Sequence, residues 1–421
     1  MVVVILVDEV LGRMGFYKTL KNRGYEIAII GTGKYSDLAD YIIDADPKNL
    51  DMVVSELTTF MQKHEIACIF TASEFGIEIA AAASEILGIP YNTSFKAIKR
   101  ARNKYLTRSF LSKNEIPSPP QFFMAESEGE IIDKLKEFKF PVILKPLNAA
   151  GSCSVTKINS LAEAREKIQL AIKNRDRMPV NMHRKDTTHD CWLVEEFLEG
   201  FEISVESITY NSKTEVICIH DKFCTIDEPY FIEKIFVTPS IRIDIKLENE
   251  IVNMTKAILS ALEFDFGVSH VEYKITSDGP RLLEVNGRVG GAMVVESVWR
   301  STGINLYEVL LDIRTGHEFR VDIDKIRREK VAFSMIPVEE GVVEEIKGFD
   351  LVNKSKHIVY AEPWVEIGER IRARQANYGG FIFATGGDIE NMLAEINKEE
   401  KKIEFVIKKE ENNDSEEICI D

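Results

Sequence analysis

The sequence predicts a mixed fold, in which an α/β domain with a parallel sheet is followed by an α+β region. Two patterns carry this prediction. Residues 1–95 alternate short apolar runs with helical segments, which indicates a parallel sheet with helices on both faces. Residues 202–244 show mostly strand pattern, and a further strand pair surrounds the turn sequence Thr276-Ser-Asp-Gly-Pro280.

In the N-terminal region each expected element has a local signal. The first seven residues are apolar and lack a basic flank, so they predict a buried strand rather than a signal peptide. Gly88 and Pro90 mark the end of an Ala-rich helix. The segment Gly31-Thr-Gly33-Lys34 is rejected as a phosphate loop, because Ala28 and Tyr35 stand where a glycine and a Ser or Thr are needed. We expect strands over 2–7, 24–30, 39–44 and 67–71, and helices ending at 22 and spanning 51–63 and 74–87.

The later elements follow from apolar periodicity and from turn residues. Ile116-Pro-Ser-Pro-Pro120 breaks a helix and is the clearest linker in the chain. Beyond about residue 331 the chain is β-rich, ending in a strand over 378–384. We expect helices over 99–114, 161–173, 247–262 and 303–314, and strands over 141–146, 191–202, 203–210, 214–222, 231–237 and 270–275.

Composition and charge disfavour several classes of protein. With 421 residues, 45% hydrophobic and 29% charged, the chain has the make-up of a globular protein of about two to four domains. Its net charge of −16 argues against a nucleic-acid partner, and no apolar run approaches the length of a membrane span. Six cysteines without a C-x-x-C pair, in a chain long enough to fold without disulfides, predict reduced thiols and a cytoplasmic location.

The most informative stretch is Arg281-Leu-Leu-Glu284-Val-Asn286-Gly-Arg288. Polar and apolar residues alternate along it as in a half-buried strand, so Glu284, Asn286 and Arg288 should point to the same side. Two oxygen donors suit Mg²⁺, and a guanidinium suits a phosphate or an oxyanion. Glu272, on the preceding strand, would lie directly across from Glu284 with a three- or five-residue loop and be offset by one with a four-residue loop.

A second set of residues fits a nucleotide. Lys145 ends an apolar strand just before a loop of small residues around Gly151, whose backbone N–H groups could close on a phosphate. Glu195 and Glu196 end a strand whose backbone could contact an adenine edge, and Glu202 follows the next turn. Taken singly these residues are weak signals, since charged residues at strand ends are usually solvated. Their order along the chain is what predicts a site for Mg²⁺ and a nucleotide.

This order resembles the ATP-grasp superfamily over residues 1 to about 318. The resemblance implies an N-terminal α/β domain (1–95), an ATP-grasp domain (96–320) with a lid at about 118–198, a small β-rich C-terminal subdomain (321–408) and a polar tail (409–421). The matching motifs are Lys104, Pro141-Val-Ile-Leu-Lys145-Pro146, the small-residue loop, Val194-Glu-Glu-Phe-Leu-Glu-Gly-Phe-Glu202, Glu272 and Glu284-Val-Asn-Gly-Arg288.

The resemblance also implies a role for each candidate residue. Adenine would be held by Glu195 and by the backbone of Glu196 and Leu198, and ribose by Glu202. Arg288 would stabilise the reacting intermediate. The loop departs from the family pattern at Ser154, where a second glycine is usual. The phosphate contacts implied are Lys104, Lys145 and Ser152, and the ligands implied for Mg²⁺ or Mn²⁺ are Glu272, Glu284 and Asn286.

Within the superfamily, Glu284-Val-Asn-Gly-Arg-Val-Gly-Gly-Ala-Met293 and Ser301-Thr-Gly-Ile-Asn-Leu306 are similar to the L-amino-acid ligase group. This resemblance implies an ADP-forming ligase that activates a small carboxylate, such as an amino acid, as an acyl phosphate and joins it to an amine. Glu233, His220 and Lys222 are candidate residues of the substrate pocket, although a packed core histidine explains His220 equally well. The family also implies a homodimer.

Three alternatives stay open at this point. The same site could phosphorylate bicarbonate and carboxylate a nitrogen. A second ligase could load an amino acid onto a carrier protein or a natural-product scaffold. A nucleotide-binding regulator without turnover is disfavoured, because every phosphate and metal position carries a chemically competent residue.

Overall fold

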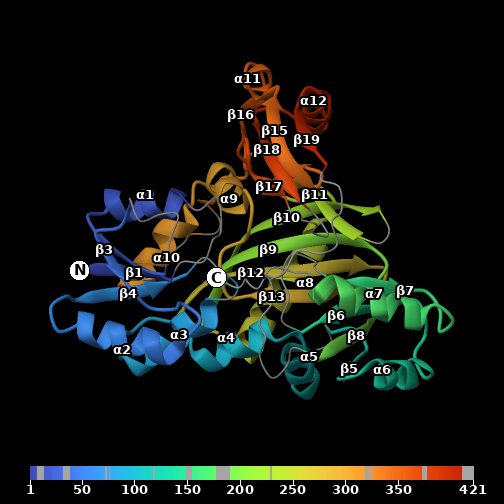
Figure 1. Ribbon diagram of the computed structural model, residues 1–421, viewed down its shortest axis with the longest axis horizontal. Coiled ribbons are helices and arrows are strands. Elements are labelled where there is room, and N and C mark those ends of the chain that lie inside the picture. Colours follow the sequence, from blue (N-terminus) through green and yellow to red (C-terminus); the bar gives the residue numbers. More distant parts are fainter. Residues whose placement is uncertain are drawn as a thin grey trace. The chain divides into compact units, whose positions relative to one another are not determined.

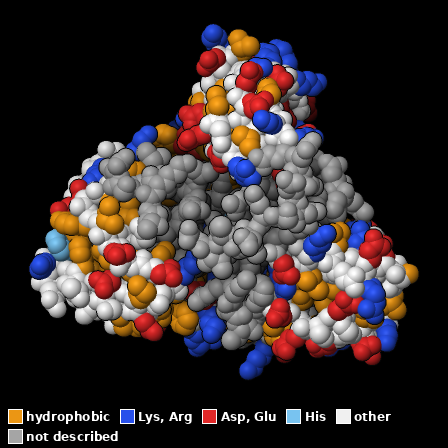
Figure 2. All heavy atoms as spheres, in the orientation of Figure 1, with side chains coloured by type: hydrophobic (Ala, Val, Ile, Leu, Met, Phe, Trp, Pro, Cys, Tyr) orange, Lys and Arg blue, Asp and Glu red, His pale blue; other side chains and the backbone are white. Residues whose placement is uncertain are grey.

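The computed structural model describes residues 1–6, 14–31, 38–71, 74, 76–116, 119–147, 154–176, 190–227, 230–317, 322, 325–371 and 377–409. The chain divides into two compact units, Met1–Val331 and Ala332–Asp421, which we describe separately. No helix among these residues is long and apolar enough to cross a bilayer. Over the described part of the face in Figure 2, Lys and Arg side chains lie among Asp and Glu side chains.

The N-terminal part of the first unit is a four-stranded sheet in the order β3-β2-β1-β4. All of its strand pairs are parallel, as the alternation of strands and helices predicts. Helices α2 and α3 cover one face and α1 and α10 the other (Figure 1). The elements are β1 (Val2–Leu6), α1 (Met14–Asn22), β2 (Glu26–Ile30), β3 (Tyr41–Ile43), α2 (Leu50–Phe60), β4 (Ile66–Phe70) and α3 (Ile77–Ile86).

A second, antiparallel sheet in the order β5-β8-β6-β7 forms the region predicted as the lid. Helices α6 and α7 pack on it around Trp192, Val194 and Leu144 (Figure 1). Its elements are β5 (Phe122–Ala125), α6 (Glu128–Leu135), β6 (Val142–Pro146), β7 (Thr156–Ile158), α7 (Ala164–Asp176) and β8 (Trp192–Glu196).

The central sheet of the first unit has the order β13-β12-β9-β10-β11, with antiparallel pairs throughout. One face packs on α4, α5 and α8 through a large apolar core that includes Val205, Val271 and Leu282. The elements are α4 (Phe95–Arg102), α5 (Lys104–Lys113), β9 (Phe201–Tyr210), β10 (Lys213–Asp227), β11 (Tyr230–Thr238), α8 (Ile245–Ala261), β12 (Gly267–Thr276), β13 (Gly279–Asn286), α9 (Val294–Thr302) and α10 (Leu306–Arg314).

Because side chains alternate along a strand, the opposite side of the central sheet carries the residues between these core positions. That side, called the polar face below, holds all of the predicted metal and substrate residues. Its members are Glu202 and Glu206 on β9, His220 and Lys222 on β10, Glu233 on β11, His270, Glu272 and Lys274 on β12, and Glu284 and Asn286 on β13.

A β-bulge places Glu284 on the polar face. The turn between β12 and β13 has only two residues, since Thr276 pairs with Gly279, so none of the loop lengths considered from sequence is the observed one. The register shifts beyond Leu282, and Leu283 is the extra residue that brings Glu284 directly across from Glu272. Leu282 and Val285, three positions apart, therefore both face the apolar core.

Capping residues divide one expected helix and move the start of another. The single helix expected over 99–114 is wrong: Asn103 is extended, and its side chain accepts a hydrogen bond from the Leu106 N–H as the N-cap of α5. The helix expected over 303–314 is also wrong at its start. Gly303, at φ +83°, ends α9, and Asn305 caps α10.

The second unit combines a sheet in the order β14-β18-β16 with a smaller one in the order β17-β15-β19. Sequence periodicity predicted a β-rich region here but missed the helix α12. The elements are β14 (Val331–Pro337), β15 (Gly341–Lys347), α11 (Phe349–Val352), β16 (Ile358–Pro363), β17 (Arg370–Ile371), β18 (Tyr378–Thr385), α12 (Ile389–Glu400) and β19 (Glu404–Lys408).

Candidate active site

Lys104 lies at one end of the polar face. The Asn103 cap makes it the first residue of α5, and its side chain is only 9% exposed. Its Nζ atom is 2.9 Å from Oε1 of Glu284, which joins the helix to the strand that carries the predicted metal ligands. The structure thus brings together two residues that are 180 positions apart in the sequence.

Lys145, at the end of β6, forms an ion pair with Glu195 of the neighbouring strand β8. Glu195 has a second cation, because Nε of Arg108 is 2.6 Å from its Oε1 atom. Burial alone would raise the pKa of Glu195, but Arg108 and Lys145 outweigh it and hold that pKa below its ordinary value. Burial, with Arg108 and Lys104, lowers the pKa of Lys145 against the opposing effect of Glu195.

Lys222 is the centre of an acidic cluster on the polar face. Its Nζ atom is 2.5 Å from Glu233, 3.1 Å from Glu272 and 3.8 Å from Glu202. Lys274 also pairs with Glu202, at 3.1 Å. Burial and the nearby Glu272 raise the pKa of Glu233, although Lys222 opposes them. The two lysines compensate these half-buried carboxylates, and a cationic metal or ligand that arrives must compete with them.

Behind Glu272 lies a buried hydrogen-bonded pair that the sequence did not predict. His270 contacts Glu206 through Nδ1 and Glu272 through Nε2, the latter at 3.0 Å. Burial would lower the pKa of His270, but the two carboxylates outweigh it and raise that pKa to about 9. His220 bonds Thr238 instead and lies 3.9 Å from Glu206, and burial lowers its pKa to about 4.

Arg288 leaves the end of β13 toward the N-terminal domain. Its Nε atom donates to Glu74 at 2.6 Å, and its Nη1 atom donates to the Val289 carbonyl at 3.0 Å. Glu74 stands beyond the carboxyl end of β4 and also lies 3.7 Å from Arg102. Sequence reasoning placed Glu74 in a helix and missed it, although the carboxyl ends of parallel strands are where ligands of α/β domains bind.

The oxygen donors of the polar face fit a small hard cation. Glu272 and Glu284 are directly opposed across two strands, and Asn286 follows on the same side of β13. Mg²⁺ is usually held by one or two carboxylates together with water and phosphate oxygens, which matches this set. Among the described residues no group of three or more His, Cys, Asp or Glu side chains is already gathered for a metal. A nucleotide phosphate would therefore have to complete the coordination.

Comparison with known proteins places this geometry in a family. An ATP-grasp domain model matches residues 138–296. The chain is 26% identical over 311 residues to the alanine–anticapsin ligase of Bacillus subtilis (strain 168), a match that covers 69% of this chain and 64% of that relative.

Residues 138–296 belong to the ATP-grasp domain family.

Two solved structures have the same ATP-grasp fold. The L-amino acid ligase of Bacillus licheniformis has a TM-score of 0.78 at 19% identity, covering 97% of this chain and 99% of that one. The biotin carboxylase domain of Hydrogenobacter thermophilus 2-oxoglutarate carboxylase, in complex with MgADP and bicarbonate, has a TM-score of 0.75 at 14% identity, covering 96% and 90%. The predicted superfamily and fold class are confirmed.

The remaining predicted ATP contacts lie in the loop after β6 and at the end of β8. Ser152 and most of the small-residue loop lie outside the described residues. Ser154, where the family usually has glycine, adopts φ +57°, a conformation that favours glycine. Glu196 pairs with Arg281 at 2.8 Å and donates its N–H to the Gln121 carbonyl. Leu198 is half-buried just beyond β8, so the predicted adenine contacts remain together at one strand end.

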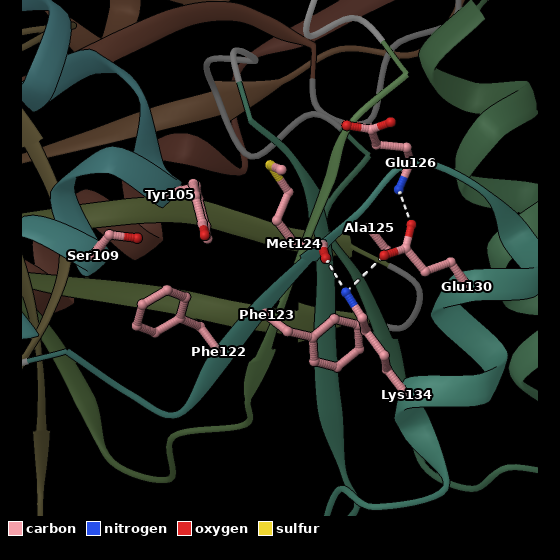
Figure 3. Close-up of a pocket in the computed structure, with 9 residues that line it drawn as sticks. All are labelled: Tyr105, Ser109, Phe122, Phe123, Met124, Ala125, Glu126, Glu130 and Lys134. Atoms are coloured by element: carbon pink, nitrogen blue, oxygen red, sulfur yellow. Dashed lines mark hydrogen bonds and ion pairs between the residues drawn. The ribbon is translucent and has the colours of Figure 1, made fainter.

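A surface pocket of about 540 Å³ lies beside the ATP-grasp site without including it. Tyr105 and Ser109 of α5 face the strand β5 across it (Figure 3). Lys134 lines its other side and donates to the Met124 carbonyl at 2.8 Å and to Glu130 at 2.7 Å. No predicted ATP, metal or substrate residue in the described part of the chain lines this pocket, so it is not the candidate active site.

Proposed function

We propose that this protein is an ATP-dependent carboxylate–amine ligase that joins an amino acid or a similar small acid to an amine. The arrangement that carries the proposal is the polar face. Glu272 and Glu284 are directly opposed there, with Asn286 on the same side, and Glu284 pairs with Lys104. The second phosphate lysine, Lys145, is paired with Glu195 in the lid sheet. The match spans 64% of the length of the alanine–anticapsin ligase, a relative named for joining alanine to anticapsin. That likeness supports the same class of reaction here.

The chemistry proceeds in two steps. The substrate carboxylate attacks the γ-phosphorus of ATP, which forms an acyl phosphate and releases ADP. The amine then attacks the acyl carbon, and inorganic phosphate leaves from the tetrahedral intermediate. Lys104 and Lys145 neutralise the phosphates, and Arg288 donates to the oxygen that becomes negative at the acyl carbon. Glu74 holds the guanidinium of Arg288 in one orientation through the 2.6 Å bond.

Mg²⁺ or Mn²⁺, held by Glu272, Glu284 and Asn286, would neutralise charge on the β- and γ-phosphates. The chain's own residues do the rest of the work. Burial would raise the pKa of Glu272, but Lys222 and His270 hold it well below its ordinary value. The carboxylate of Glu272 is therefore ionised without a metal ion. The lid sheet would exclude water from the acyl phosphate.

A second candidate is a carboxylase that activates bicarbonate. The specific observation in its favour is the fold likeness to the biotin carboxylase domain that binds MgADP and bicarbonate. The same phosphates, metal ligands and Arg288 would serve that reaction, so the residues of the polar face do not distinguish the two. The acceptor of the activated carboxyl group does.

The test is phosphate release from ATP, screened over pairs of L-amino acids with bicarbonate alone as one well. We expect release that requires two amino acids, with a product mass equal to their sum less one water. Release with bicarbonate alone would assign the carboxylase reaction. The absence of release in every well would contradict a small-molecule ligase and favour a carrier-protein substrate or a regulator.

A further inference from the structure

Arg108 is the largest fully buried side chain on the described part of the chain, with 0% of its surface exposed, and no motif pointed to it. Its position on α5, one turn after Lys104, places it behind the phosphate lysines. The Nε atom donates to Oε1 of Glu195 at 2.6 Å. A terminal nitrogen, Nη2, donates to the carbonyl of Leu283 at 2.6 Å, and Nη1 has no partner among the described residues.

The Glu195 carboxylate is shared by two cations, Arg108 on one oxygen and Lys145 on the other. We expect contact with the phosphates of ATP to weaken the pair of Lys145 with Glu195, because both anions compete for the three N–H donors of one ammonium. Glu195 is 3% exposed. If Arg108 were absent, Lys145 would be its only cation, and the departure of Lys145 would leave a buried carboxylate without charge compensation. Such a loss is strongly unfavourable, because water cannot replace the missing partner.

We propose that Arg108 is a positioning residue that retains the charge compensation of Glu195 and so releases Lys145 for the nucleotide phosphates. Arg108 is suited to this task because its guanidinium stays protonated and its Nε–H is fixed on Oε1 by the buried surroundings. Lys145 then exchanges one anionic partner for another, while Glu195 keeps its bond to Arg108.

A second hydrogen bond joins Arg108 to β13, the strand that carries Glu284 and Asn286. Leu283 is the bulged residue of β13, and its carbonyl accepts from Nη2 of Arg108. An extra residue in a bulge lacks a ladder partner, so an external donor is needed there. The same guanidinium thus holds Glu195 of the lid sheet and the bulge that sets Glu284 opposite Glu272.

This proposal rests on the proposed function, and the experiment separates the two. Binding of Mg²⁺·ADP is measured by calorimetry for the wild type, Arg108→Met, Arg108→Lys, Glu195→Gln and the double variant Arg108→Met/Glu195→Gln. We expect Arg108→Met to weaken binding by about tenfold or more, because Lys145 becomes the sole cation of Glu195. Glu195→Gln lowers the affinity by whatever its adenine contact contributes, but the neutral amide makes no demand on Lys145, so adding Arg108→Met to it should change the affinity by no more than about threefold.

Arg108→Lys keeps a cation beside Glu195 and should bind Mg²⁺·ADP within about fivefold of the wild type. A purely structural role predicts that Arg108→Met weakens binding by the same factor in the Glu195→Gln background as in the wild type. That result, wild-type affinity in Arg108→Met, or an equal loss in Arg108→Lys would overturn the proposal.

Arg175→Met is the matched control for folding. Arg175 is also a buried arginine, pairing with Asp176 and stacking on Trp192 of the lid sheet, and none of these three residues is assigned to the site. The Arg175→Met substitution should lower the melting temperature without changing the Mg²⁺·ADP affinity. A wild-type protein that does not bind Mg²⁺·ADP at all would contradict the proposed function itself.

Discussion

Glu284→Gln tests the metal assignment with the smallest change of shape. Glu284 contributes an oxygen opposite Glu272 and is also the partner of Lys104, at 2.9 Å. The amide keeps the volume and one oxygen but removes the charge. Loss of one stabilising contact of this kind lowers turnover by roughly 10²–10³. Loss of the ion pair with Lys104 should reduce stability by about 1–3 kcal/mol, toward the lower figure because Glu284 is 24% exposed.

The assay is phosphate release from ATP at a series of Mg²⁺ concentrations, with chemical denaturation on the same preparations. We expect a lower maximal rate and a higher Mg²⁺ concentration at half-saturation for Glu284→Gln. Glu215→Gln is the matched control: it removes an exposed carboxylate on β10 that pairs with Lys256 at 2.8 Å, and should leave both quantities unchanged. Turnover of Glu284→Gln that equals the wild type at every Mg²⁺ concentration would refute the metal assignment.

Three further predictions concern the buried groups. The pKa of His220 lies at about 4 because burial disfavours its charged form, so the unfolded chain takes up the proton at a higher pH than the folded chain. Wild-type stability should therefore fall as pH drops from 6.5 to 4, by up to roughly 3 kcal/mol. In urea titrations His220→Asn should reduce this dependence of stability on pH, and an unchanged dependence would contradict the assignment. Ser154→Gly should raise stability by about 1 kcal/mol by relieving the positive φ angle, read from the urea midpoint, whereas a lower midpoint would show that the Ser154 side chain is required. Burial raises the pKa of Cys68 to about 12, so iodoacetamide at neutral pH should not alkylate this thiol in the folded protein. Mass spectrometry of the tryptic peptide should show alkylation only after unfolding, and labelling of the folded protein would contradict the burial of Cys68.

Period-two alternation was enough to predict that Glu284 and Asn286 share a face of β13. Glu284 and Asn286 lie together as expected, since each strand position follows from the one two before it. The bulge at Leu283 was not predictable in this way, because turn length and bulge compensate each other in setting the register. Only the observed pairs of Thr276 with Gly279 and of Tyr273 with Leu282 distinguish a two-residue turn with a bulge from a longer loop.

The ion pairs of the site were beyond the reach of local patterns. Arg108 and Glu195 are 87 positions apart, and Arg288 and Glu74 are 214 apart, so neither pairing leaves a periodic signal. The predicted adenine role of Glu195 stays a prediction, although its side chain is engaged with two cations. Asn103 shows a different limit: the capping preference was visible in the sequence, but the helical periodicity on both sides concealed the break.

The most direct test of the central claim is oxygen transfer from the substrate carboxylate to phosphate. Once the screen has identified the acid and the amine, the reaction is run with the acid labelled by oxygen-18 in both carboxylate oxygens, and the released phosphate is analysed by mass spectrometry. An acyl phosphate intermediate predicts one labelled oxygen in each phosphate, with one retained in the amide. Unlabelled phosphate would contradict carboxylate activation by phosphoryl transfer and, with it, the proposed roles of Lys145, Arg288 and the polar face.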